Sequence, residues 1–247
     1  MASETLPPNE AHLWIVHPDP IRDPELLREY DSLLTPDERE KVSRFRFEKD
    51  RHSSLVTRAL VRTTLSRYSE VSPREWRFVA NEYGRPEVDE PRDERPLRFN
   101  LSHTSGLIVC LVARGRQVGV DVEDRSRGGE LLDVADRFFS PFEVQALRAL
   151  PEEDQIDRFF FYWTLKESYI KARGLGLAIP LSQFSFDLDA ENYKGIRVLF
   201  DSELDDEPER WRFSALSYGR RHAIASTLEL EDERDFTLKL RETTPLG

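Results

Sequence analysis

Two acidic residues stand two positions apart in an otherwise apolar segment of the chain. Asp121 and Glu123 alternate with Val120 and Val122 in the sequence Gly-Val-Asp-Val-Glu. Successive side chains of an extended strand project to opposite faces, so the valines can be buried while both carboxylates project from the other face. The pattern predicts a strand over 118–123 that presents two carboxylates in one small patch.

A third carboxylate and a cation lie further along the chain. The apolar run 159–163 precedes Glu167 and Lys171, and at helical spacing Trp163, Glu167 and Lys171 are successive i, i+4 neighbours on one face. A helix so rich in aromatic residues leaves little room for solvated charges. Its charged side chains therefore need partners.

Clustered carboxylates repel one another unless a cation neutralises them. Mg²⁺ prefers oxygen ligands and usually keeps positions for water and substrate phosphate. Asp121, Glu123 and Glu167, with Lys171 beside them, therefore predict a Mg²⁺–diphosphate site. A structural alternative stays open, in which Glu167 and Lys171 form an ordinary helix ion pair worth about 0.2–0.5 kcal/mol and the strand carboxylates are solvated.

These segments belong to a set of motifs that resembles a known family. The set comprises Asp-x-Glu after a Gly-Val strand, Trp-x-x-Lys-Glu-Ser-x-x-Lys, Asn-Leu-Ser-His at 100–103 and Phe-Phe-Ser-x-x-Glu at 138–143. Their order and spacing resemble the 4′-phosphopantetheinyl transferases of the larger, surfactin-synthetase-activating type. The resemblance implies a Mg²⁺-dependent enzyme that transfers phosphopantetheine from coenzyme A to a serine of an acyl or peptidyl carrier protein, releasing adenosine 3′,5′-bisphosphate.

The resemblance also implies roles for individual residues. Asp121, Glu123 and Glu167 correspond to the metal ligands, and Lys171 to the lysine that neutralises charge on the transferring diphosphate. A serine and a histidine near a turn suit phosphate hydrogen bonds, although in hairpin turns they are more often solvated. The residues implied in coenzyme A binding are Ser102, His103, Arg85, Lys41 and Lys171.

Glu143 has two interpretations. The resemblance implies that it is the base that deprotonates the carrier serine, a role typically worth about 10²–10⁴-fold in rate. The sequence Ser140-Pro-Phe-Glu143 is equally a capping box that opens a helix, and Thr35-Pro-Asp-Glu38 repeats the pattern. Both interpretations stay open at this point.

The segment from Arg39 to Arg67 carries nine basic and three acidic residues, a local net charge of +6. It is the predicted phosphate and partner surface, although about half of its charges could belong to a solvated helix face. Glu38 and Ser53 stand where relatives of the surfactin type carry basic residues. The residues that could substitute for them are Lys41, Arg51, His52 and Arg58.

Composition limits the function classes. A net charge of −11 over 247 residues argues against general nucleic-acid binding. The apolar run 107–113 is far shorter than the roughly 18–20 residues of a membrane span, and the first residues do not resemble a signal peptide. Cys110 is the single cysteine, so no disulfide forms within the chain, and we expect it to be buried. We expect a monomeric, cytoplasmic enzyme with no nucleic-acid or membrane partner.

The order of the predicted elements indicates an α+β fold made of two similar α/β halves, and the resemblance implies that the halves are related by a pseudo-twofold axis with the cofactor between them. We expect an N-terminal half over 1–115 that contributes to coenzyme A binding, a C-terminal half over 116–228 that carries the metal site, and an acidic tail over 229–247. Strands are predicted at 12–17, 76–80, 118–123, around 184 and 196, and within 211–227, with a hairpin at 98–113. Helices are predicted at 24–33, 36–68, 131–138, 141–150 and 154–172, and a loop at 88–96.

Two other functions fit the same residues. A Mg²⁺-dependent hydrolase of nucleotide diphosphates would use the carboxylates without any carrier protein. A non-catalytic coenzyme A-binding module would need neither the carboxylates nor Lys171, so their joint presence disfavours it.

Overall fold

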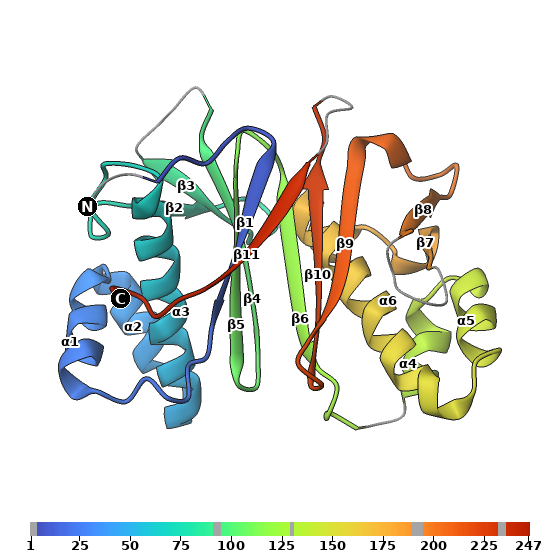
Figure 1. Cartoon of the computed structure of the whole chain (residues 1–247), viewed down its shortest axis with the longest axis horizontal. Helices are drawn as coiled ribbons and strands as arrows, with labels where there is room; N and C mark the ends of the chain where they lie inside the picture. Colours follow the sequence, from blue (N-terminus) through green and yellow to red (C-terminus); the bar gives the residue numbers. More distant parts are fainter. Residues whose placement is uncertain (1–3, 91–94, 129–130, 189–194, 232–235) are drawn as a thin grey trace. The chain divides into compact units, whose positions relative to one another are not determined.

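The computed structural model describes residues 4–90, 95–128, 131–188, 195–231 and 236–247. The chain folds into two compact units, the first made of 1–81, 86–115 and 234–247 and the second of 82–85 and 116–233. Each unit contains helices beside a mostly antiparallel sheet (Figure 1). The predicted α+β class is confirmed.

The first unit contains a four-stranded sheet in the order β11-β1-β5-β4. β4 and β5 form the predicted hairpin, and β1 pairs antiparallel with β5 and parallel with β11. The helix predicted over 36–68 is broken at 44–47. The strands are β1 (Glu10–Val16), β2 (Arg77–Ala80), β3 (Pro86–Glu90), β4 (Leu97–Thr104), β5 (Leu107–Arg114) and β11 (Thr237–Glu242), and the helices are α1 (Pro24–Leu33), α2 (Pro36–Ser43) and α3 (Glu48–Arg67).

Two parts of the first unit differ from the sequence prediction. A loop was predicted over 88–96, but residues 88–90 belong to β3, which pairs with β2. Residues 91–94 of the predicted loop lie outside the described residues. The segment treated as an acidic tail contains β11, whose residues 237–242 pair with β1. Both strands are short and largely exposed. β3 carries a single large apolar residue, Val88, whereas in β11 Leu238 and Leu240 do alternate with charged residues, but the acidic residues around them make the segment resemble a tail.

The second unit repeats the order of the first: one strand, three helices, a hairpin and two further strands. In each sheet the first of these strands pairs with the last, and the last with the one before it. Two similar α/β halves are thus confirmed. The elements are β6 (Val118–Asp124), α4 (Leu131–Phe138), α5 (Pro141–Arg148), α6 (Glu152–Arg173), β7 (Phe184–Asp187), β8 (Arg197–Phe200), β9 (Trp211–Tyr218) and β10 (His222–Glu229), with short 3₁₀ helices at Gly176–Ala178, Leu181–Gln183 and Pro208–Arg210.

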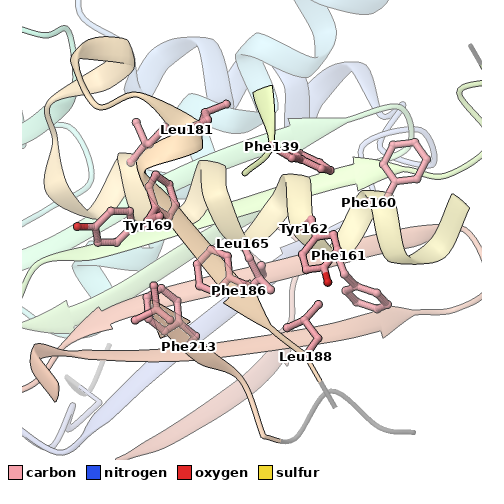
Figure 2. Close-up of a cluster of buried hydrophobic side chains, with 14 of the residues drawn as sticks. Phe139, Phe160, Phe161, Tyr162, Leu165, Tyr169, Leu181, Phe186, Leu188 and Phe213 are labelled. Atoms are coloured by element: carbon pink, nitrogen blue, oxygen red, sulfur yellow. The ribbon is translucent and has the colours of Figure 1, made fainter. Parts of the chain in front are cut away.

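The long helix α6 forms the centre of the second unit. It packs against β6 and β10 on one side and against α4 and α5 on another (Figure 1). Its aromatic residues join those of β7 and β9 in a large buried cluster (Figure 2). Trp163, Glu167 and Lys171, which the helical spacing predicted to share one face, are each only partly buried. The helix ends at Gly174, which adopts the left-handed conformation that glycine tolerates best.

Each unit contains an ion pair that joins the glutamate of a capping box to a buried cation on the long helix. In the first, Glu38 at the start of α2 pairs with Arg62 of α3, which also donates to the carbonyls of Pro73 and Trp76. In the second, Glu143 at the start of α5 pairs with Lys166 of α6 at 2.8 Å. Lys166 likewise donates to two carbonyls of the segment that follows its helix, those of Leu181 and Phe184.

Candidate active site

One face of β6 lies directly against α6. Gly119 on this face meets α6 at Ser168 and Ala172, where even a Cβ atom would overlap the backbone of the helix. Asp121 and Glu123 follow on the same face at the period-two spacing of a strand. Asp121 is 5% exposed and Glu123 is half-buried. The two carboxylates predicted to share a face therefore project toward the helix.

Glu167 and Lys171 of α6 lie next to these carboxylates. The ammonium of Lys171 donates to Oδ1 of Asp121 at 2.6 Å and to the carbonyl of Val120 at 3.3 Å. Arg127, after the end of β6, donates to Oε2 of Glu123 at 3.2 Å. Two cations of the chain thus already compensate part of the negative charge.

The pKa values of Glu167 and Glu123 reflect this crowding. Burial raises the pKa of Glu167 above its ordinary value, the negative charge of Asp121 raises it further, and Lys171 opposes the shift. Burial and then Asp121 also raise the pKa of Glu123, against the opposing charge of Arg127. The folded protein therefore keeps these carboxylates in an environment that favours an added cation.

The donor set fits Mg²⁺ by its chemistry. Asp121, Glu123 and Glu167 are the oxygen ligands that hard cations prefer, and they lie close enough to perturb one another. In the part of the chain that the structure describes, however, no three His, Cys, Asp or Glu side chains are arranged to hold a metal ion. Lys171 and Arg127 instead contact two of the three carboxylates.

Ser102 and His103 belong to the first unit, at the end of β4. They are strand residues just before the turn at 105–106, not residues of the turn. As consecutive residues of a strand, they project to opposite faces, and Ser102 is buried while His103 is exposed. Of the two, His103 presents its side chain to solvent.

Arg85 stands at the C-terminal end of α6. Its Nη1 donates to the carbonyl of Ala172 at 2.8 Å and to that of Lys171 at 3.3 Å, and its guanidinium packs over Gly174. A cation at this end of a helix stabilises the unsatisfied carbonyls and the helix dipole. Its proposed contact with the cofactor stays a prediction.

Most of the basic residues proposed to replace family contacts already have structural partners. Glu38 pairs with Arg58 as well as with buried Arg62. Arg51 donates to carbonyls at the break between α2 and α3, and a ring nitrogen of His52 donates to the carbonyl of Pro18. Lys41 is exposed, and no ion pair within the described residues engages its ammonium. Lys41 is the member of this set best placed for an outside phosphate.

Glu143 is fully buried, and both of its carboxylate oxygens have hydrogen-bond partners. One carboxylate oxygen accepts from the amide and hydroxyl of Ser140 and from Lys166, and the other accepts from the amide of Phe186 at 2.9 Å. Burial lowers the pKa of Lys166, and the charge of Glu143 opposes that shift. A base must reach its substrate, so this environment argues against the general-base assignment, which stays an untested prediction.

Three of these contacts were not predicted from the sequence. In the sequence, Lys166 is one residue of the Trp-x-x-Lys-Glu motif, Gly119 begins a strand motif, and Arg127 belongs to no motif. The echo between Glu38 and Glu143 was the available signal for the buried pairs, because a capping glutamate repeated before two long helices predicts a repeated structural role.

Comparison with known proteins agrees with this geometry. The family described as the 4′-phosphopantetheinyl transferase superfamily matches residues 117–227, which contain β6 and α6, and the 4′-phosphopantetheinyl transferase N-terminal family matches residues 23–115. The 4′-phosphopantetheinyl transferase HetI of Nostoc sp. is 38% identical over 175 residues, covering 70% of this chain and 73% of that protein. Sfp of Bacillus subtilis is 34% identical over 167 residues, covering 68% and 72%.

The chain therefore belongs to the 4′-phosphopantetheinyl transferase superfamily, and the resemblance of its motifs is confirmed. It is an enzyme of this class, of the Sfp-like type. A holo-(acyl-carrier-protein) synthase from Bacillus anthracis resembles 46% of this chain at 18% identity and a TM-score of 0.38, and the assignment rests on the sequence matches instead. Within the described residues, no helix is long and apolar enough to cross a membrane.

The buried pair allows a test of Glu143 that separates its structural role from a catalytic one. Glu143→Gln leaves Lys166 buried without its counter-charge, so we expect a loss of about 3–5 kcal/mol in the free energy of unfolding, measured with urea. Glu38→Gln should act alike through Arg62. Glu143→Gln combined with Lys166→Met removes both charges and should recover most of the stability together with near wild-type kcat. A stable double variant with kcat lowered about 10²-fold or more would establish Glu143 as the base.

The raised pKa of Glu167 makes a second prediction, about the metal-free protein. A carboxyl whose pKa is higher in the folded than in the unfolded state costs stability as the pH rises from the unfolded pKa through the folded one. Glu167→Gln removes this cost, so we expect its thermal midpoint to exceed that of wild type by about 2–4 °C at pH 8 and to match it at pH 4. Glu29→Gln, an exposed helix residue, is the control. An unchanged or lower midpoint at pH 8 contradicts the interpretation.

Proposed function

We propose that this enzyme transfers the 4′-phosphopantetheine group of coenzyme A to a serine hydroxyl of an acyl or peptidyl carrier protein, with Mg²⁺ bound by Asp121, Glu123 and Glu167. The observation that carries the proposal is the packing of the β6 face against α6, which places Asp121 2.6 Å from Lys171 and within electrostatic range of Glu167. This arrangement lies inside the segment matched by the superfamily.

The reaction would be an in-line displacement at the β-phosphorus of coenzyme A. The serine oxygen forms a bond to that phosphorus while the bond to the bridging oxygen breaks, adenosine 3′,5′-bisphosphate leaves, and the serine proton passes to water. Mg²⁺, when bound, would supply charge neutralisation on the diphosphate. Lys171, released from Asp121 by the arriving phosphate, would hold the charge that develops on the leaving oxygen.

The rest of the chain's contribution is positioning. The side chain of Lys171 is 28% exposed and the side chain of Asp121 is 6% exposed, so the ammonium is the accessible member of their pair. On the first unit, His103 and Lys41 are the exposed members of the proposed coenzyme A set, and we assign them to the phosphates. The carrier class and the pathway would be identified by comparing rates across a panel of carrier proteins.

The first test of the proposal uses Glu167→Gln, which removes one ligand charge at constant size and helix propensity. Mass spectrometry of an apo-carrier protein incubated with coenzyme A, Mg²⁺ and enzyme should show the added phosphopantetheine with wild type and with Glu29→Gln. With Glu167→Gln we expect transfer lowered about 10²-fold or more, at an unchanged circular dichroism spectrum. Near wild-type turnover of the variant at saturating Mg²⁺ would reduce Glu167 to an ion-pair residue. Cleavage of coenzyme A without modification of the carrier would indicate a hydrolase. If coenzyme A is not cleaved and the carrier is not modified, the protein is a binding module.

The second test concerns His103. If its imidazole contacts the 3′-phosphate, His103→Ala should raise the KM for coenzyme A several-fold more than the KM for 3′-dephospho-coenzyme A, because the contact exists only when that phosphate is present. Initial rates with both substrates give the comparison, and Lys41→Ala should be measured beside it. Equal increases for the two substrates would place His103 elsewhere on the cofactor or in a structural role.

A further inference from the structure

Gly119 lies where β6 comes closest to α6. A Cβ at this position would overlap the carbonyl oxygen of Ser168 and lie 2.5 Å from the amide nitrogen of Ala172. Both obstacles are backbone atoms of a helix, so no side chain can move aside to make room. Gly119 is also absent from the described glycines with positive φ, so its backbone conformation does not require glycine. The close approach of strand and helix does.

A hydrogen bond holds the same helix residue to the neighbouring strand. Thr227 of β10 is the direct register partner of Gly119, and both it and Ser168 are fully buried. The hydroxyl of Ser168 donates to the carbonyl of Leu165 at 2.9 Å. The hydroxyl of Thr227 therefore donates to Oγ of Ser168, at 2.7 Å. Ser168 thus contacts two adjacent strands, packing against Gly119 of β6 and bonding to Thr227 of β10.

This point of contact lies between the charged residues of the site. Ser168 directly follows Glu167 on α6, and Ala172 directly follows Lys171. Asp121 is two residues from Gly119 on the same face of β6. Any displacement of the helix at Ser168 and Ala172 therefore moves both helix charges relative to the strand carboxylates.

We propose that Gly119, with Ser168 and Thr227, positions α6 on the sheet and so sets the spacing between Asp121 and Glu123 on β6 and Glu167 and Lys171 on α6. This inference rests on the proposed metal site and diphosphate chemistry, and it names the residues that give that site its dimensions. None of the three positioning residues needs to touch the substrate.

The test is Gly119→Ala. An added methyl group must push the helix away, and a misplacement of about 1 Å at reacting groups can cost about 10²-fold in rate. We expect kcat to fall about 10²-fold and the Mg²⁺ activation constant to rise. Mn²⁺ binding, measured by electron paramagnetic resonance with and without carrier protein, should weaken in parallel. Gly128→Ala is the matched control, because a Cβ there meets nothing within 4 Å. It should behave as wild type.

A second pair of variants covers the case in which Gly119→Ala fails to fold. Thr227→Val keeps the shape but removes the hydrogen bond to Ser168, and Thr227→Ser keeps the hydroxyl. We expect Thr227→Val to raise the Mg²⁺ activation constant and Thr227→Ser to restore it. Wild-type values of both the Mg²⁺ constant and kcat in Gly119→Ala and in Thr227→Val overturn the positioning role.

That outcome is distinguishable from a failure of the proposed function. If wild type itself neither requires a divalent cation nor binds Mn²⁺, the metal assignment fails and the positioning proposal fails with it. If Glu167→Gln is inactive while Gly119→Ala and Thr227→Val both retain normal metal binding and turnover, the transferase mechanism stands and the positioning proposal alone is overturned.

Discussion

The packing of α6 against β6 is the contact on which the rest of the second unit depends. From Arg158 onward the helix is buried on nearly all sides, so each polar group on it must find a partner inside the protein. Lys166 does so with three acceptors, Glu143 and the carbonyls of Leu181 and Phe184. The same contacts hold the segment that follows α6, so the burial of one lysine organises a loop, a hairpin and the start of another helix.

The proposed site lies on a stripe of α6 that is only partly buried. The stripe that contains Glu167 and Lys171 is only partly buried and faces strand carboxylates instead of saturating partners. Burial, and then the neighbouring charge of Asp121, raise the pKa of Glu167 and of Glu123, so keeping these two carboxylates ionised costs stability. A protein keeps such a cost where function needs charge that its own cations balance only in part, and here a bound divalent cation would neutralise the remaining negative charge. The helix α6 therefore carries two kinds of charged residue. Lys166 is buried with its counter-charge Glu143, whereas Glu167 is partly buried beside other carboxylates.

The sequence alone predicted what depends on local periodicity. The alternation of valines with Asp121 and Glu123 predicted β6 and its acidic face, and the i, i+4 spacing predicted the stripe of α6, because side-chain direction in a single element follows from its own geometry. It did not predict that Glu143 would meet Lys166, since these residues belong to different helices whose packing no local pattern records. It also did not show what Gly119 faces, because a glycine in a strand reads alike whether it is exposed or pressed against a helix. β11 was not predicted although Leu238 and Leu240 alternate with charged residues, because the acidic composition of the surrounding segment resembles a tail.

The two units show which residues turn a structural frame into a site. Counting from the buried cation of each long helix, the next residue is Thr63 after Arg62 in the first unit but Glu167 after Lys166 in the second. The residue four positions further is Arg67 in the first and Lys171 in the second. Arg67 lies over the ring of Trp14 from β1, whereas Lys171 meets the carboxylate of Asp121 from β6. The same capping glutamate and buried cation thus support an aromatic contact in one unit and an acidic cluster in the other. Because the frame is common to both, the frame alone does not make a site. What differs is the carboxylate-bearing face of β6 and the glutamate opposite it, which are the residues proposed for the chemistry, whereas Glu143 belongs to the part that is shared.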